Sequence, residues 1–256
     1  MSYITDLGYD TSTFFLEAAR GNIPGVQTVH KFGSNPNVGG TEEDVWAAGG
    51  KYNWMQGAEQ LRIFSSDAAD QSAGTGCRSI KVIGLDADFS QVSSVVALSG
   101  TSTVTSTATM VRVVRAYAET VGTYTGSNIG NLTVASPTYG NVAYIEAARG
   151  QTQLSMYTVP KNKTAALVDF IVNVGVSNKS CDVGFWQRQL ADDVTAPFTS
   201  QRLVTFFRGL DGSPAAINFE SPPLFPEKTD LWATGQFPSG SGAAVDVTYE
   251  LVLFDD

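Results

Sequence analysis

The single histidine limits the chemistry that this chain could perform. His30 is the one histidine among 256 residues, so a zinc site or another metal centre built from several histidines is impossible. A Ser-His-Asp or Cys-His arrangement would have to use His30, which lies far in sequence from Cys77 and Cys181. We therefore interpret His30 as a hydrogen-bonding packing residue, and we predict no catalytic residue and no enzymatic activity.

The clustered carboxylates have simpler explanations than metal binding or hydrolysis. Asp86-Ala87-Asp88 follows a predicted strand and could ligate calcium, but no EF-hand spacing surrounds it and strand ends commonly carry aspartate. Glu42-Glu43-Asp44 fits the first turn of a helix. Asp192-Asp193 and Asp255-Asp256 fit a turn and a frayed end. Nothing selects a facing pair of glycosidase carboxylates, so we predict neither a metal site nor a cofactor site.

Two further motifs lack the context that would make them functional. Gly74-Thr75-Gly76 has no downstream glycine and no Lys-Ser/Thr pair, so it is not a phosphate-binding loop. Cys77 and Cys181 fit two small buried residues. A bridge between them is the alternative, and their spacing does not decide between the two.

Composition and charge argue against two classes of partner. The net charge is −9 and no basic stripe is present, so we expect no nucleic-acid partner. No basic start leads into an apolar run at the N-terminus, so we expect no signal peptide. No stretch approaches the ~18 apolar residues of a membrane span, so we expect no membrane partner.

Alternation of apolar and polar residues is the clearest structural signal. Residues 244–254 and 165–176 both alternate with a period of two, which is typical of strands with one buried face. The apolar face predicted for the first range is Val245, Val247, Tyr249, Leu251 and Leu253. The apolar face predicted for the second range is Val168, Phe170, Val172, Val174 and Val176.

Further strands and one helix complete the predicted fold. The other predicted strands are residues 79–85, 92–98, 102–107, 109–119, 139–147, 153–159, 182–190, 203–207 and 231–234. A helix is predicted over residues 41–48, with Thr41 as its cap. So many strands at this spacing predict an all-β fold, a jelly-roll-like two-sheet β-sandwich over residues 61–256. Two β subdomains meeting near residue 136 are an alternative organisation of this range.

Residues 1–60 differ from the rest of the chain. They combine turn residues with aromatic residues, so we predict an extended N-terminal arm that is irregular and aromatic-rich. Burying one large apolar side chain is worth about 1.5–3 kcal/mol, so the arm must be buried within its own subunit or between subunits. We predict that it attaches to a neighbour. The candidate attachment residues are Phe14, Phe15, Phe32, Trp46 and Trp54.

Several phrases of the sequence resemble a known family. The first set lies at Gly21–Gly25, Val29–Pro36, Glu43–Trp46 and Gly49–Tyr52, and further phrases lie at 84–86, 98–101, 150–152, 156–160 and 163–164. These phrases resemble a poorly characterised family of virion structural proteins of tailed bacteriophages, common in aquatic viruses. The resemblance is carried phrase by phrase over most of the chain, and it brings no catalytic residues with it.

The resemblance implies a β-rich, non-catalytic component of the virion, made in the cytoplasm of the host bacterium. We predict a capsid decoration, cement or other head-associated protein that stabilises the particle by contacts with the major capsid protein or other virion proteins. A tail or fibre component that binds a host surface receptor or glycan is the alternative. A homo-oligomer is predicted, with a trimer as first choice by analogy with phage structural proteins.

Overall fold

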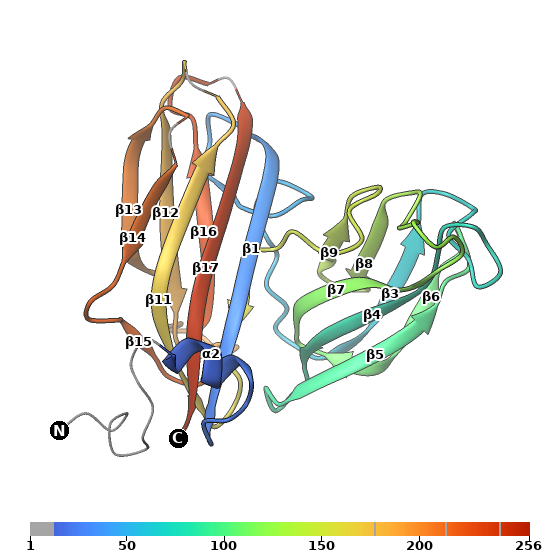
Figure 1. Ribbon diagram of the computed structural model, residues 1–256, viewed down its shortest axis with the longest axis horizontal. Helices are drawn as coiled ribbons and strands as arrows, with labels where there is room; N and C mark the ends of the chain where they lie inside the picture. The colour runs from blue at the N-terminus through green and yellow to red at the C-terminus, as the bar shows by residue number, and fades with distance from the viewer. Residues whose placement is uncertain (1–12, 177, 213, 241) are drawn as a thin grey trace.

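The computed structural model describes residues 13–176, 178–212, 214–240 and 242–256. These residues fold into two bodies of antiparallel strands, which we call the large lobe and the small lobe (Figure 1). The described residues contain one helix of six residues, α2 (Phe14–Ala19), and seventeen strands. The predicted all-β fold is therefore confirmed. No helix among the described residues is long and apolar enough to cross a membrane.

The large lobe is built from strands near both ends of the chain. Its strands are β1 (Val26–Val38), β2 (Glu43–Asp44), β10 (Tyr157–Thr158), β11 (Lys163–Val174), β12 (Cys181–Arg188), β13 (Arg202–Leu210), β14 (Ala215–Asn218), β15 (Leu224–Phe225), β16 (Asp230–Gln236) and β17 (Ala243–Asp255). One sheet has the order β1-β17-β11-β14, and the other has the order β10-β16-β12-β13. The short strands β15 and β2 pair with β11 and β16.

The order of these strands identifies the architecture. Counted along the chain, the eight strands of the two main paths give one sheet with the order first-eighth-third-sixth. The other sheet has the order second-seventh-fourth-fifth. This is the strand order of a jelly roll, which packs two Greek keys as two sheets. The predicted jelly-roll-like sandwich is confirmed for the large lobe.

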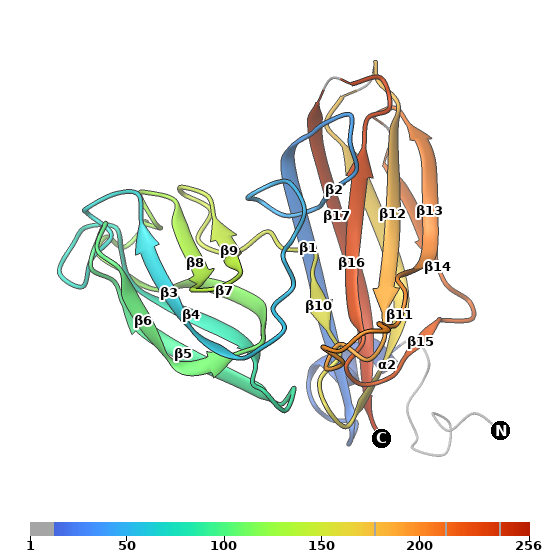
Figure 2. The same ribbon diagram turned by 180° about the vertical axis from the view of Figure 1, so that it is seen from behind.

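The small lobe is inserted between β2 and β10 of the jelly roll (Figure 2). Its strands are β3 (Glu59–Ser65), β4 (Cys77–Leu85), β5 (Gln91–Ala97), β6 (Val104–Met110), β7 (Arg112–Val121), β8 (Leu132–Ser136) and β9 (Gly140–Ile145). They form one sheet with the order β6-β3-β8-β9 and another with the order β5-β4-β7. The chain enters and leaves this lobe side by side, because Trp46 and Leu154 form an antiparallel bridge.

The alternation of the sequence accounts for the core of the jelly roll. In β17 all five residues predicted on the apolar face are buried. In β11 a register shift between Leu167 and Asp169 adds one residue to the strand. Leu167 therefore faces the core before the shift and Phe170 faces it after the shift, whereas Val168 is half-buried. The predicted shared face is correct from Phe170 onward and wrong at Val168.

Three predictions about the first half of the chain need correction. Residues 26–38 form β1, so the expectation of an irregular arm is wrong there. Residues 41–48 contain the short strand β2 in place of the predicted helix. Residue 136 ends β8 inside the small lobe, so the two strand bodies do not meet there. The boundary between the two bodies lies where the chain enters and leaves the insertion.

Gly33 of β1 marks a close approach that explains why this strand carries glycine. A Cβ atom at position 33 would lie 2.6 Å from the Ser155 nitrogen and 2.6 Å from the Val45 oxygen. Both are backbone atoms in the segments that lead into and out of the small lobe. We predict that Gly33→Ala lowers the free energy of unfolding by about 1–3 kcal/mol, because the backbone must shift to admit a methyl group.

Urea denaturation of matched variants measures this effect. Gly57→Ala is the control, because a Cβ atom there meets nothing within 4 Å. Its expected change lies within about 0.5 kcal/mol. Equal stability of the two variants would show that the approach at Gly33 is not a constraint.

Candidate binding site between the two lobes

A buried ion pair joins the two lobes. Arg112 of β7 in the small lobe donates from Nε to Oδ1 of Asp230 and from Nη2 to Oδ2 of Asp230, with both distances 2.9 Å. Asp230 begins β16 of the large lobe, and the side chains are 3% and 1% exposed. Two parallel hydrogen bonds of this kind fix orientation as well as distance. The pair therefore sets how the lobes meet.

The remaining hydrogen-bonding groups of this pair are also used. Arg112 Nη1 donates to the carbonyl oxygens of Met55 and Val111, and Thr158 Oγ1 donates to Asp230 Oδ1 at 2.6 Å. The guanidinium carbon lies 5.2 Å from the centroid of the Trp54 ring. A buried ion pair whose hydrogen-bonding partners are all supplied by the protein has a structural role. We assign the pair no role in ligand chemistry.

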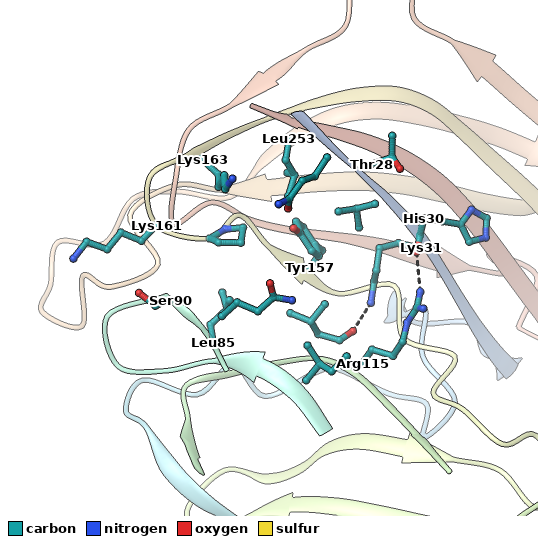
Figure 3. Close-up of a pocket in the computed structure, with 16 residues that line it drawn as sticks. Thr28, His30, Lys31, Leu85, Ser90, Arg115, Tyr157, Lys161, Lys163 and Leu253 are labelled. Atoms are coloured by element: carbon teal, nitrogen blue, oxygen red, sulfur yellow. Dashed lines mark hydrogen bonds between the residues drawn. The ribbon is translucent and has the colours of Figure 1, made fainter. Parts of the chain in front are cut away.

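A cleft of about 470 Å³ lies beside this junction, between the two lobes (Figure 3). The large lobe contributes β1, Tyr157 of β10 and the segment 160–163 to its walls. The small lobe contributes Ile83 and Leu85 of β4, the start of β5, and β7. These segments meet because the insertion folds back against β1, the edge strand of its sheet.

Positive side chains dominate the polar lining of the cleft. Lys31, Arg115, Lys161 and Lys163 line it together with His30, and no described lining residue is Asp or Glu. His30 is paired with Glu250, and Lys163 is paired with Asp255. Both of these pairs have an exposed member. The cleft is thus a basic site on a chain whose net charge is −9.

Lys31 is the most unusual of these residues. Its side chain is almost completely buried, at 3% exposed, and Nζ donates to the carbonyl oxygen of Val114 in β7 at 2.7 Å. Arg115 reaches in the opposite direction, from Nη2 to the carbonyl oxygen of His30 in β1 at 2.9 Å. Figure 3 shows these two hydrogen bonds side by side. Each lobe therefore offers a cation to the backbone of the other.

Burial changes the acid–base behaviour of Lys31. Removal of the ammonium group from water lowers its pKa, and the nearby charge of Arg115 lowers it further, to about 7. A lysine with such a pKa exchanges its proton near neutral pH. Its charge can therefore respond to whatever occupies the cleft.

The candidate attachment residues lie in several places. Trp46 is buried in the core cluster that contains Tyr52 and Trp232, and Trp54 packs against this cluster. For these two residues burial within the subunit, the alternative to attachment, is what the structure shows. Phe32 of β1 is half-buried. Phe14 and Phe15 lie on α2, where Phe15 is 49% exposed, so attachment stays a prediction for this helix.

The other residues considered for chemistry have structural positions. Asp86 Oδ1 accepts hydrogen bonds from the backbone N–H groups of Asp88 and Ser90, as in a turn. Cys77 and Cys181 are free and buried in different core clusters. His30 is exposed and hydrogen-bonded to Glu250, so its predicted packing role is wrong while its hydrogen bond is present. Across the described ranges, no three His, Cys, Asp or Glu side chains gather as metal ligands.

No motif or spacing in the sequence points to Lys31 and Arg115. Each lies in a strand, and the distance between them along the chain hides their proximity. The one local hint would be that Lys31 occupies an inward-facing position in the alternation of its strand. Only the folded insertion brings the two cations together.

Comparisons with known proteins were made for the whole chain. No protein-family model and no curated protein matches the sequence. Among solved structures, an infectious bursal disease virus Gx strain structure has 9% identity and a TM-score of 0.29, covering 93% of this chain and 77% of that chain. A cowpea mosaic virus top component, described as naturally occurring empty particles, has 10% identity and a TM-score of 0.22, covering 78% and 82%. These scores are too low to establish a shared fold, so the jelly-roll assignment rests on the strand order.

Replacement of the buried lysine tests the description of the cleft. We predict that Lys31→Met raises the free energy of unfolding by about 1–4 kcal/mol at pH 6, because an apolar side chain of similar length removes a buried charge. The folded pKa of about 7 lies below the ordinary 10.5, so the unfolded chain binds more protons between these values. Stability of the unsubstituted protein therefore rises with pH across this window, and the gain from Lys31→Met shrinks from pH 7 toward pH 10.

Denaturation at pH 6 and pH 9 measures the difference. The control is Lys161→Met, which removes an exposed lysine of the same cleft and is expected to change stability by less than about 0.5 kcal/mol at both pH values. A gain from Lys31→Met that does not depend on pH would contradict a titrating, desolvated lysine.

Proposed function

We propose that this chain is a structural protein of a virion, and that it is a capsid decoration, cement or other head-associated protein. The observation that carries the proposal is the jelly-roll strand order of the large lobe. Jelly rolls serve as viral capsid domains, as lectin domains and as cupins. A cupin centre needs several histidines, and His30 is the single one in the sequence.

The surface of the large lobe supports association with other proteins. β13 ends its sheet, so one of its sides has no strand partner in the described part of the chain. This strand carries Leu203 and Phe206, which are 47% and 37% exposed. Exposed apolar residues on an unpaired edge favour contact with another chain. We propose that this edge, together with Phe14 and Phe15 of α2, contacts the major capsid protein, other virion proteins or further copies of the chain.

The position of the protein in the particle decides between the two versions of the proposal. Immunogold electron microscopy of the parent virion, with antibodies against the purified protein, is the direct experiment. Label on the head supports a decoration or cement protein. Label on the tail or fibre supports the alternative, a component that binds a host surface receptor or glycan. Absence of label from intact and from disrupted particles would overturn the proposal of a virion protein.

We propose a homo-oligomer, with a trimer as the first choice. The predicted result is a trimer by multi-angle light scattering at micromolar concentration, and Leu203→Ser with Phe206→Ser shifts it toward the monomer. Removing two large apolar side chains from an interface weakens association by a few kcal/mol. Leu224→Ser, which changes a 63% exposed leucine outside β13, is the matched control and keeps the trimer. A monomer in the unsubstituted protein would contradict the proposal.

A further inference from the structure

The basic cleft continues into a longer groove. A second hollow, of about 590 Å³, shares Ile83 and Arg115 with the cleft and adds Arg149, Gly150 and Gln151. We call the two hollows together the interlobe groove. Lys31 and Lys161 line the first hollow, Arg149 lines the second, and Arg115 lines both. The length of the groove suits an extended ligand better than a single small ion.

Part of the positive charge of the interlobe groove is unbalanced, although His30, Lys163 and Arg149 are paired with Glu250, Asp255 and Glu146. None of the ion pairs among the described residues involves Lys31, Arg115 or Lys161. No described residue that lines either hollow is Asp or Glu. Lys31 has three N–H donors, and among the described residues a single acceptor, the Val114 carbonyl oxygen, is within hydrogen-bond distance. An anion in the groove would supply both the missing charge and the missing acceptors.

The neutral lining narrows the kind of anion. Gln27 and Gln91 bring side-chain amides to the cleft, Ser90 brings a hydroxyl, and Gln151 brings an amide to the second hollow. Such groups exchange hydrogen bonds with hydroxyl groups. Ile83 and Leu85 provide an aliphatic wall between them. Cations, amides and a short apolar wall together fit a hydroxylated body that carries acidic groups at intervals.

We propose that the interlobe groove binds an acidic polysaccharide, through sugar carboxylates held by Arg115 and Lys161 beside the buried Lys31. This activity goes beyond the proposed decoration or cement role, which needs no saccharide site. Single-stranded nucleic acid fits less well, because such grooves stack successive bases on exposed aromatic side chains. Here Tyr157 is buried and Tyr117 is half-buried, so neither offers an exposed ring face for stacking.

Isothermal titration calorimetry with a defined pair of probes tests the proposal. The probes are trigalacturonic acid and its methyl ester, which have the same sugar body with and without carboxylate charge. The acid is expected to bind at least about tenfold more tightly, the equivalent of one charge-assisted hydrogen bond. Lys161→Gln and Arg115→Gln should each weaken binding of the acid by about tenfold. Arg62→Gln, which removes an exposed cation of β3 outside the groove, should leave binding unchanged.

Proton uptake on binding gives a second readout, independent of the Lys161→Gln and Arg115→Gln variants. A carboxylate beside Lys31 favours its charged form, so binding at pH 7.5 should take up a fraction of one proton, seen as a dependence of the heat on the buffer. Lys31→Met should abolish this uptake. The other titratable or charged groups that face the cleft or pair with Lys31 across the sheet are His30, Arg115, Tyr157, Lys161, Lys163 and Tyr249.

Three results would overturn the proposal. The first is equal binding of the acid and its ester, and the second is equal weakening by Arg62→Gln and Lys161→Gln. The third is tighter binding of a control anion, either inorganic phosphate or a single-stranded oligonucleotide, than of the acidic sugar. None of these results bears on where the protein lies in the particle, so failure here is distinguishable from failure of the proposed virion role.

Discussion

The arrangement of the molecule depends on one buried ion pair, between Arg112 and Asp230. The small lobe is an insertion in a jelly roll, joined to it by two chain segments and by the packing of Trp232 and Ala191 against its core, and the ion pair adds a directional contact. Both charges are out of water and fully hydrogen-bonded, so the pair is costly to break and leaves one orientation with every partner satisfied. The interlobe groove exists because this junction holds β7 of the small lobe beside β1 of the large lobe.

The parts of the fold that could be predicted from the sequence are those in which apolar and polar residues alternate locally. β17 was predicted on the correct face because its apolar residues alternate without interruption. The face of β11 was lost at Val168, because a bulge adds a residue and alternation cannot show which residue is extra. β1 was missed because Gly33, Asn35 and Pro36 are residue types common in turns. In the structure Gly33 lies at a close approach between backbone segments, and Asn35 is buried and hydrogen-bonded to Glu43 and Asp44.

The site was beyond the reach of local patterns for a different reason. Lys31 and Arg115 come from strands of different lobes, and nothing near either residue predicts that the other lies beside it. The aromatic residues of the first 60 positions raise a related problem. Trp46 is buried and Trp54 is half-buried within the subunit, and the choice between an intrasubunit core and a neighbour depends on the tertiary fold. Residue types alone show that a side chain must be buried, but they do not show which surface covers it.

A double-mutant cycle measured by urea denaturation shows whether Arg112 and Asp230 lock the two lobes into one body. One cooperative transition is expected for the unsubstituted protein. Arg112→Met and Asp230→Asn are expected to be coupled by about 1–3 kcal/mol, because either change alone leaves a buried polar partner without its hydrogen bonds. Additive effects within about 0.5 kcal/mol, together with separate transitions for the two lobes, would contradict such a lock.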